Sequence, residues 1–394
     1  MDIVIVADFC GMLDETANNR FLFIAKMLQQ EHSVEIVTSD FCHAKKTYFE
    51  DLSGRFPFQV TMLHEAAYTK NISLRRFYAH YIWGKNVKRY LNTRKKPDVV
   101  FCAVPTLTAA KETAKYCKRN HIKYVVDVQD LWPEAFQMIF KVPVLSDIVF
   151  LPFKLIADSA YRQADEVCAV SQTYVNRVLA VNKRCREGCC VFLGTKLEEF
   201  DMHAQRYANS EEHDDIWLAY CGSLGKSYDL ECAIDAVSIL NKQGYHNIKF
   251  WIMGDGALKE KFEAHAREKD VNAVFTGFMQ YPQMCGMLAS CDIAINPIVA
   301  GSAGTIINKH GDYAAAGIPV VNSQESQEYR TLIDTYGMGL NCINGDAADM
   351  AEKIKILIDN PELRKHMGNN ARKCAEEKFD RKFTYQQIAN KICQ

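Results

Sequence analysis

Several features that would assign a chain to a special class are missing from this sequence. It has no internal repeat, no low-complexity tract and a formal net charge of only −1, from 47 Lys and Arg against 48 Asp and Glu. A solenoid and a disordered chain are therefore excluded. The most apolar segment, residues 140–157, is interrupted by two lysines, two prolines and an aspartate. We therefore do not expect it to span a membrane.

A zinc motif and a basic leader are also missing. The 15 cysteines are scattered, and the densest group, Cys185, Cys189 and Cys190, has no histidine nearby to complete a zinc site. Free, mostly buried thiols are typical of a reducing cytosol. The first residues, MDIVIVADFC, carry no basic leader and predict a β-strand instead of a signal peptide. We therefore expect a cytoplasmic protein.

Short β-rich runs alternate with helical stretches in both halves of the chain, which is typical of doubly wound parallel sheets. A chain of 394 residues is also expected to form two domains. We predict an α/β fold with two Rossmann-like doubly wound domains, residues 1–195 and 196–375, that face each other across a cleft. Residues 376–394 are expected to form a C-terminal helix that packs back toward the first domain.

Charge is divided unevenly between the two halves. Residues 1–195 hold 26 Lys and Arg against 20 Asp and Glu, whereas residues 196–394 hold 21 against 28. Within the first half, residues 66–97 contain nine basic residues, no acidic residue and several aromatic residues. The stretch is either a solvated helix face over a core or a surface for anionic lipid or nucleic acid. Together with residues 140–157, it favours peripheral membrane contact, because no nucleic-acid module accompanies it.

Three loops of the second half combine small residues with the expected start of a helix. They are YCGSLGKS at 220–227, MGDGALKE at 253–260 and the segment that begins at Ser302. Small residues let a ligand approach the backbone, and free N–H groups at a helix N-terminus bind phosphate oxygens. Since all three loops follow predicted strands, they predict one nucleotide-diphosphate site. The residues expected to bind the nucleotide in these loops are Gly222, Ser223, Lys226, Gly254, Gly256, Gly304, Thr305 and Ile306.

Lys309 and Asp312 lie three residues apart near the start of the third of these helices. One interpretation is a surface ion pair worth about 0.2–0.5 kcal/mol. That pair would be poorly oriented, because its cation lies nearer the positive end of the helix dipole. A nucleotide removes the objection, since Lys309 would face phosphate and Asp312 would accept hydrogen bonds from a ribose diol. We therefore favour the nucleotide interpretation.

Five segments of the second half follow one another in a recognisable order and spacing. They are GSLGKSYDLECAIDA, WIMGDGALKEKFE, VFTGF…YPQM, LASCDIAINPI and KHGDYAAAGIPVV. The series resembles the donor-binding domain of family-4 (group 1) retaining glycosyltransferases of the GT-B fold. In the first half, NNRFLFIAKML and DVQDLWPEA resemble bacterial enzymes that build capsule, O-antigen or other lipid-linked polysaccharides.

The sequence departs from this family at two places. The family usually carries two glutamates eight positions apart, and here Gly304 and Asp312 occupy those positions. An arginine often follows the glycine of the first loop, where this chain has Ser223. The resemblance then leaves Lys226 and Lys309 to carry positive charge, as in a subfamily variant.

The resemblance implies a hexosyl or N-acetylhexosaminyl transferase that takes its sugar from a nucleotide sugar, most often UDP-linked. The acceptor would be a polyprenyl-diphosphate-linked or saccharide hydroxyl at the cytoplasmic face of the membrane. No Asp-x-Asp metal motif follows a suitable strand, so no metal or other cofactor is expected. Lys226, Lys309 and the helix N-termini at Gly256 and Thr305 would then stabilise the leaving diphosphate.

For the candidate ligand-binding residues of the first half, an ordinary structural role is the alternative interpretation. The resemblance implies a sugar contact for Asp130, whereas its position before Pro133 is also typical of a helix cap. Gly11 and Arg20 would approach the diphosphate on closure, or form a turn and a surface cation. Two rival functions remain for the whole chain, namely a nucleotide-sugar 2-epimerase of the same fold and a non-catalytic nucleotide-sugar-binding partner of another transferase.

Overall fold

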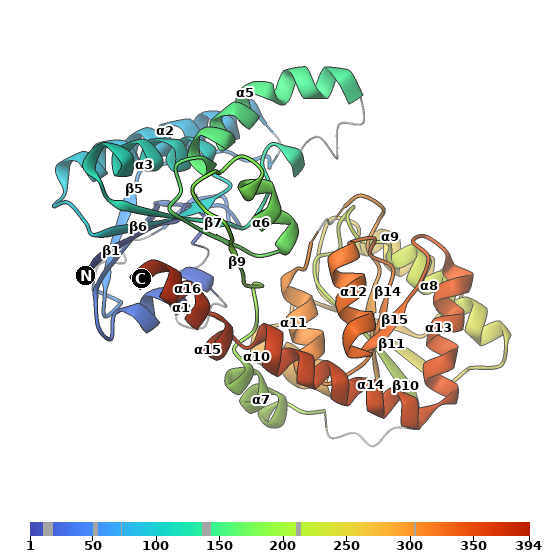
Figure 1. Cartoon of the computed structure of the whole chain (residues 1–394). Helices are drawn as coiled ribbons and strands as arrows, with labels where there is room; N and C mark the ends of the chain where they lie inside the picture. The colour runs from blue at the N-terminus through green and yellow to red at the C-terminus, as the bar shows by residue number, and fades with distance from the viewer. Residues whose placement is uncertain (11–18, 50–53, 72, 136–142, 210–213, 303–304) are drawn as a thin grey trace. The chain divides into compact units, whose positions relative to one another are not determined.

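The computed structural model describes the chain except for residues 11–18, 50–53, 72, 136–142, 210–213 and 303–304 (Figure 1). It divides into two compact units. The first contains Met1–Val191 and Tyr385–Gln394, and the second contains Phe192–Thr384. The α/β class and the parallel sheets expected from the sequence are confirmed in both units.

The first unit is built on a seven-stranded parallel sheet of order β5-β2-β1-β6-β7-β8-β9. Helices α1 and α16 pack on one face of this sheet, where their apolar side chains share a core with Ile3 and Ile5 of β1. Figure 1 shows α2 and α3 on the other face. The strands are β1 (Asp2–Val6), β2 (Ser33–Ser39), β5 (Gln59–Leu63), β6 (Val99–Val104), β7 (Lys123–Val128), β8 (Glu166–Ala169) and β9 (Cys189–Cys190), and a separate hairpin joins β3 (Phe41–Cys42) to β4 (Thr47–Tyr48). The helices are α1 (Arg20–Leu28), α2 (Leu74–Thr93), α3 (Leu107–Asn120), α5 (Pro143–Tyr161), α6 (Gln172–Leu179) and α16 (Gln386–Cys393).

The second unit is built on a six-stranded parallel sheet of order β12-β11-β10-β13-β14-β15. Its strands are β10 (Ile216–Cys221), β11 (Ile248–Met253), β12 (Ala273–Gly277), β13 (Ile293–Asn296), β14 (Val320–Asn322) and β15 (Gly339–Asn341). Its helices are α7 (Leu197–Arg206), α8 (Leu230–Lys242), α9 (Lys259–Glu268), α10 (Tyr281–Ala289), α11 (Asn308–Ala315), α12 (Gln327–Tyr336), α13 (Ala347–Asp359), α14 (Pro361–Cys374) and α15 (Arg381–Thr384), with a π-helical turn at Ala375–Phe379.

Successive residues of the second sheet enter different cores, because side chains alternate between the faces of a strand. Leu218 and Tyr220 of β10 join the core that contains α8, α9 and α13. Trp217 and Ala219 join the core that contains α7, α10, α11, α12 and α14. Both faces are therefore covered, which explains why β10 is apolar throughout.

The division between the units falls at Val191/Phe192, whereas the sequence placed it at 195/196. Backbone hydrogen bonds account for this difference, since Thr195 N donates to Phe379 O at 2.8 Å and Arg381 N donates to Thr195 O at 3.1 Å. The single helix expected over 376–394 is instead divided at Asp380 and Tyr385 into the π-helical turn, α15 and α16, and of these only α16 belongs to the first unit.

Within the described part of the chain, no helix is long and apolar enough to cross a membrane.

Candidate functional site

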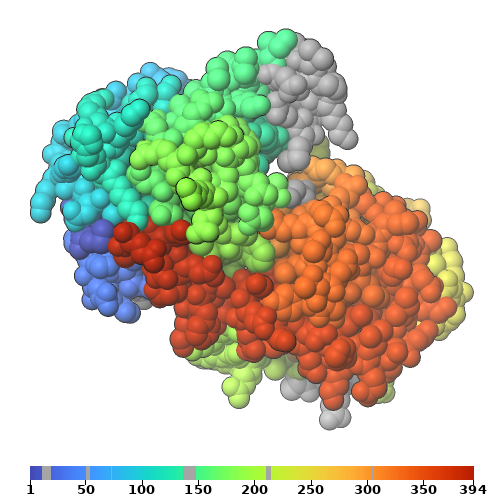
Figure 2. Space-filling model, viewed as in Figure 1, coloured from blue at the N-terminus to red at the C-terminus, as the bar shows by residue number. Residues whose placement is uncertain are grey.

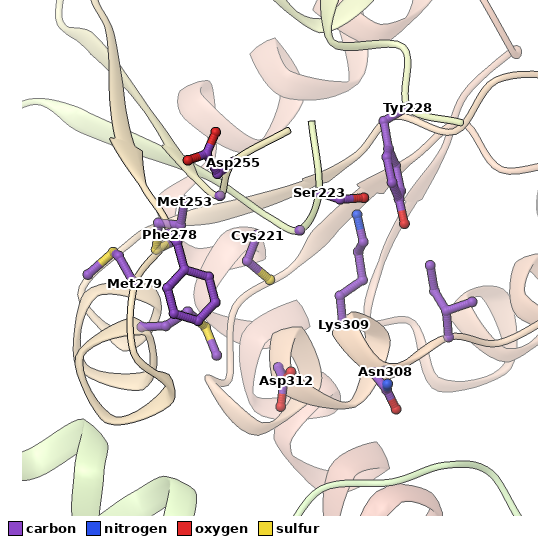
Figure 3. Close-up of a pocket in the computed structure, with 14 residues that line it drawn as sticks. Cys221, Ser223, Tyr228, Met253, Asp255, Phe278, Met279, Asn308, Lys309 and Asp312 are labelled. Carbon is purple, nitrogen blue, oxygen red and sulfur yellow. The ribbon is translucent and has the colours of Figure 1, made fainter. Parts of the chain in front are cut away.

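A cavity of about 510 Å³ lies within the second unit, where the carboxyl ends of three parallel strands meet the start of α11 (Figure 3). Ligands of open parallel α/β sheets bind at this edge. Its lining residues come from the ends of β10 and β11 and the loops that follow them, from the segment after β12, from α10 and from the start of α11. They are Cys221, Gly222, Ser223, Tyr228, Met253, Gly254, Asp255, Phe278, Met279, Met284, Ile307, Asn308, Lys309 and Asp312.

Glycines are required where the first two loops cross. A Cβ atom on Gly254 would lie 1.8 Å from Gly222 O, and one on Gly256 would lie 2.4 Å from Leu224 O. The loops are also joined by backbone hydrogen bonds, because Gly222 N donates to Met253 O at 3.0 Å and Leu224 N donates to Asp255 O at 2.9 Å. The two predicted loops therefore pack together as one part of the cavity wall, to which Gly222 and Gly254 contribute.

Lys309 is a buried cation that faces the loop after β10. Its side chain rises from α11 toward Ser223 and Tyr228 (Figure 3), and it is only 7% exposed. The Nζ atom lies 4.1 Å from the ring centroid of Tyr220 and 4.0 Å from that of Tyr228, so the two rings hold it by cation–π contacts. It has no hydrogen-bond partner in the described part of the chain. Burial lowers the pKa of Lys309 to about 7.

Asp312 lies one turn further along α11 and is also 7% exposed. Its Oδ1 atom accepts hydrogen bonds from Thr195 Oγ1 at 3.0 Å and from Tyr281 OH at 2.9 Å. Burial raises the pKa of Asp312 to about 6. No ion pair joins Asp312 to Lys309, both of which lie in the described part of the chain, so the surface-pair interpretation is wrong. Two hydroxyl donors instead fix the carboxylate in the cavity wall.

The helix that carries these residues begins later than the sequence suggested. We expected its N-terminus at Thr305, but α11 begins at Asn308, because Ile307 N donates to His310 Nδ1 at 3.2 Å at the start of the helix. Thr305 and Ile306 are buried and lie outside the cavity lining. Gly304 falls outside the described residues.

The structure separates two other candidates of the second unit from the cavity. Lys226 is exposed and does not line it. Gly256 packs against the backbone of Leu224 and does not line the cavity either. The diphosphate contacts expected from Gly256 and Lys226 stay predictions, and neither residue lines this cavity.

Arg20 of the first unit is a buried structural residue. Its Nε and Nη2 atoms donate to the Asp127 carboxylate at 3.0 and 2.9 Å, and Nη1 donates to Val191 O at 3.1 Å. Its guanidinium also lies 4.8 Å from the Tyr385 ring centroid. The alternative expectation of a surface cation is wrong, because only 4% of Arg20 is exposed. The diphosphate contact expected for Arg20 stays a prediction.

Asp130 follows β7 and accepts a hydrogen bond from Trp132 Nε1 at 3.0 Å. Burial raises the pKa of its carboxyl group. The sugar contact expected for Asp130 stays a prediction. Gly11 falls outside the described residues.

Several residues of the site were not predicted from the sequence. Phe278 directly follows β12 and is 73% exposed, so the strand-end rule that found Gly222 and Gly254 could also have found it. Tyr228 and Tyr220 gave no signal, because their contact with Lys309 depends on the folding of distant segments.

Residues 201–374, which include every residue that lines the cavity, match the family model described as Glycosyl transferases group 1. The chain is similar to an uncharacterized glycosyltransferase, MJ1069, of Methanocaldococcus jannaschii, at 24% identity over 229 residues, which cover 58% of each chain. A second uncharacterized glycosyltransferase of that organism, MJ1178, is 23% identical over 42% of this chain. The matched segments span 58% and 44% of these two relatives, or about half their length.

The structural comparisons cover the whole chain. Anabaena Alr3699/HepE, solved in complex with UDP, superposes with a TM-score of 0.71 at 16% identity and 99% coverage of both chains. Sucrose-phosphate synthase from Thermosynechococcus elongatus superposes with a TM-score of 0.75 at 14% identity, covering 98% of this chain and 97% of that one. The chain therefore has the GT-B type of α/β fold.

Proposed function

We propose that the protein is a retaining glycosyltransferase that moves a sugar from a UDP-sugar to the hydroxyl group of a lipid-linked or saccharide acceptor. One observation carries the proposal, namely the buried Lys309 ammonium with no hydrogen-bond partner in the described residues, facing a cavity of the segment that matches the group 1 family model. A buried cation without an anion is costly, and a diphosphate supplies the missing charge. The UDP complex of the Anabaena neighbour supports uridine as the nucleoside.

Each wall of the cavity has a role in this proposal. Lys309 neutralises the diphosphate as the bond to the sugar breaks, which stabilises the leaving group without a metal ion. Asp312 accepts a hydrogen bond from a ribose hydroxyl, because Thr195 and Tyr281 hold its Oδ1 atom and leave its other oxygen for a ligand. Phe278 offers an exposed ring on which the uracil base stacks.

The acceptor side of the proposal rests on the first unit. We place the enzyme at the cytoplasmic face of a membrane, in the synthesis of cell-surface polysaccharide such as capsule or O-antigen, transferring a hexose or an N-acetylhexosamine. The acceptor hydroxyl would lose its proton to the leaving phosphate on the same face of the sugar, so no protein base is needed.

An exposed apolar surface supports membrane contact. Helix α5 exposes Ile148, Val149, Leu151 and Leu155, and Figure 2 shows this part of the chain at the surface of the first unit, in green. Helix α2 adds Leu74, Tyr78 and Tyr81. The two helices are in contact, since the ring centroids of Phe77 and Phe153 lie 5.0 Å apart. We define these seven exposed residues as the α2–α5 surface, and basic side chains of α2, such as exposed Arg75 and Arg89, would face anionic headgroups.

Vesicle binding tests this surface. The double change Ile148→Ser and Leu151→Ser is expected to weaken binding to vesicles of anionic phospholipid at least about 10-fold, because each buried aliphatic side chain contributes about 1.5–3 kcal/mol. Phe383→Ser is the matched control, since Phe383 is 65% exposed on the second unit. Equal cosedimentation of all three proteins would refute the assignment.

The activity itself is tested with UDP-, GDP- and ADP-sugars, each with and without a membrane lipid extract. Transfer predicts UDP release that depends on the extract. Lys309→Met should abolish it, whereas Lys226→Met, a lysine outside the cavity, should retain it. A changed free nucleotide sugar would indicate the 2-epimerase, and UDP binding without turnover would indicate the non-catalytic partner.

A further inference from the structure

Three buried polar groups meet at the carboxyl edge of the first sheet. Asp8 follows β1, Glu65 follows β5 and His80 lies on α2. They are 7%, 1% and 4% exposed. Asp8 and Glu65 each offer a carboxylate oxygen and His80 offers a ring nitrogen, and these three atoms all lie within 4.8 Å of one another.

Asp8 Oδ1, Glu65 Oε1 and His80 Nε2 have no N–H or O–H donor among the described residues. The side chains of Asp8 and Glu65 lie close enough to share a hydrogen bond when one of the two carboxyl groups is protonated. The ion pair of Glu65 is with His80, at 4.0 Å from Oε1 to Nε2, and no described Lys or Arg lies within 4.0 Å of either carboxylate. Buried oxygen and nitrogen atoms without a partner are costly, so their convergence points to a ligand.

The other oxygen of each carboxylate is fixed by a hydroxyl group. Thr106 Oγ1 donates to Asp8 Oδ2, and Ser39 Oγ donates to Glu65 Oε2 at 2.7 Å. Each hydroxyl leaves one carboxylate oxygen directed at the common centre. Hydrogen bonds of this kind orient the ligands of metal ions in proteins.

The His80 ring is held between aromatic side chains. It stacks on Trp132 with ring centroids 5.2 Å apart, and the edge of Phe9 lies 5.6 Å away. Burial, with the charges of Arg76 and His43, lowers the pKa of His80 to about 3. The ring is therefore a neutral imidazole, which is the form that binds metals.

The charge of Arg76 acts on both carboxyl groups, but its guanidinium group contacts other residues. Its guanidinium carbon lies 4.6 Å from the Trp132 ring centroid, and Nη1 donates to Asn71 O at 2.8 Å. It forms no ion pair with Asp8 or Glu65 within the described residues. The two carboxyl groups therefore lie together without an ion-paired cation, and burial raises the pKa of both.

We propose that Asp8, Glu65 and His80 bind one divalent cation of the Mn²⁺ or Zn²⁺ type. Two carboxylate oxygens and one imidazole nitrogen suit these ions. The cation would neutralise the two carboxylates and satisfy all three facing atoms at once. Three protein ligands leave coordination positions for water or a hydroxyl oxygen. This site goes beyond the proposed function, since that function assigns no metal to either unit.

Titration with Mn²⁺, followed by loss of the free-ion electron paramagnetic resonance signal, tests the proposal on the full chain. Mn²⁺ avoids the many thiols of the chain because it prefers oxygen ligands. The wild type should bind one Mn²⁺ that Zn²⁺ displaces. Ser39→Ala should weaken binding about 10-fold, and Glu65→Gln at least about 100-fold.

Glu112→Gln is the matched control, because Glu112 is another buried glutamate of the first unit, 8% exposed, and it pairs with Lys85 and Lys88. It should bind Mn²⁺ as the wild type does. If Glu65→Gln fails to fold, as judged by circular dichroism, Ser39→Ala decides the question. A wild type that binds no Mn²⁺, or equal affinities in all the variants, overturns the proposal and leaves a hydrogen-bonded acid–carboxylate pair.

Discussion

Replacing Lys309 by methionine tests two consequences of its buried charge, namely the lower stability of the folded protein and the tighter binding of UDP. Methionine keeps the length of the side chain between the Tyr220 and Tyr228 rings but removes its charge. In the wild type without nucleotide, burial lowers the pKa of Lys309 from 10.5 to about 7. A shift of this size corresponds to a cost of about 4–5 kcal/mol for the folded state at neutral pH.

Lys309→Met is therefore expected to raise the free energy of unfolding at pH 7, by an amount on the order of 2–4 kcal/mol once relaxation of the site is allowed for. The sign follows from proton linkage. The unfolded chain binds a proton at Lys309 up to pH 10.5, whereas the folded chain releases it near pH 7. The cost is thus fully present below about pH 7, and the advantage of the variant should shrink as the pH rises toward 10.5.

The same change should weaken UDP binding about 10- to 100-fold, since a hydrogen bond to a charged group contributes about 1.5–3 kcal/mol. Wild-type binding should take up a proton, because the diphosphate favours charged Lys309. UDP affinity should then fall as the pH rises from 7 to 8.5 in the wild type, and stay level in Lys309→Met. Asp312, with its pKa of about 6, is largely ionised in this window, and Cys221, with its pKa raised to about 12, stays protonated.

Urea unfolding and isothermal titration calorimetry in buffers of different ionisation enthalpy measure both effects. Lys226→Met is the control, because Lys226 is an exposed lysine outside the cavity. If Lys309→Met keeps wild-type stability and UDP affinity, or still shows the pH dependence of the wild type, Lys309 is not the phosphate-binding cation.

Three further substitutions test neighbouring parts of the structure. Asp312→Asn should weaken UDP binding at least about 10-fold by calorimetry with the fold intact, and unchanged affinity would remove the ribose contact. Gly254→Ala should lower the free energy of unfolding by about 2 kcal/mol or more in urea, because its Cβ would lie 1.8 Å from Gly222 O; a neutral effect would contradict the crossing of the loops. Arg20→Met should destabilise the protein by about 3–5 kcal/mol by leaving Asp127 buried without its partner, and a loss below about 1 kcal/mol would show that the pair is dispensable.

The sequence was most informative where chemistry follows from local pattern. Alternation of apolar strands with helices predicted two parallel α/β sheets, and the rule that ligands meet strand ends brought Gly222, Ser223 and Gly254 to one cavity. The poor orientation of Lys309 and Asp312 as a helix pair correctly indicated that they do not neutralise each other.

The features that could not be predicted from the sequence depend on contacts between side chains that the local pattern does not reveal. Arg20 could not be assigned from its neighbours, because its partner Asp127 lies 107 residues away. The helix start moved from Thr305 to Asn308, since the His310 side chain accepts the Ile307 N–H. Asp8, Glu65 and His80 are far apart in the sequence, and only the order of strands β5, β2 and β1 brings them together.

A structure of the chain with bound UDP tests the central claim most directly. We predict the nucleotide in the cavity of the second unit, with a diphosphate oxygen within hydrogen-bond distance of Lys309 Nζ and a ribose hydroxyl on Asp312. UDP bound outside this cavity, or inside it with Lys309 still without a phosphate partner, would contradict the account.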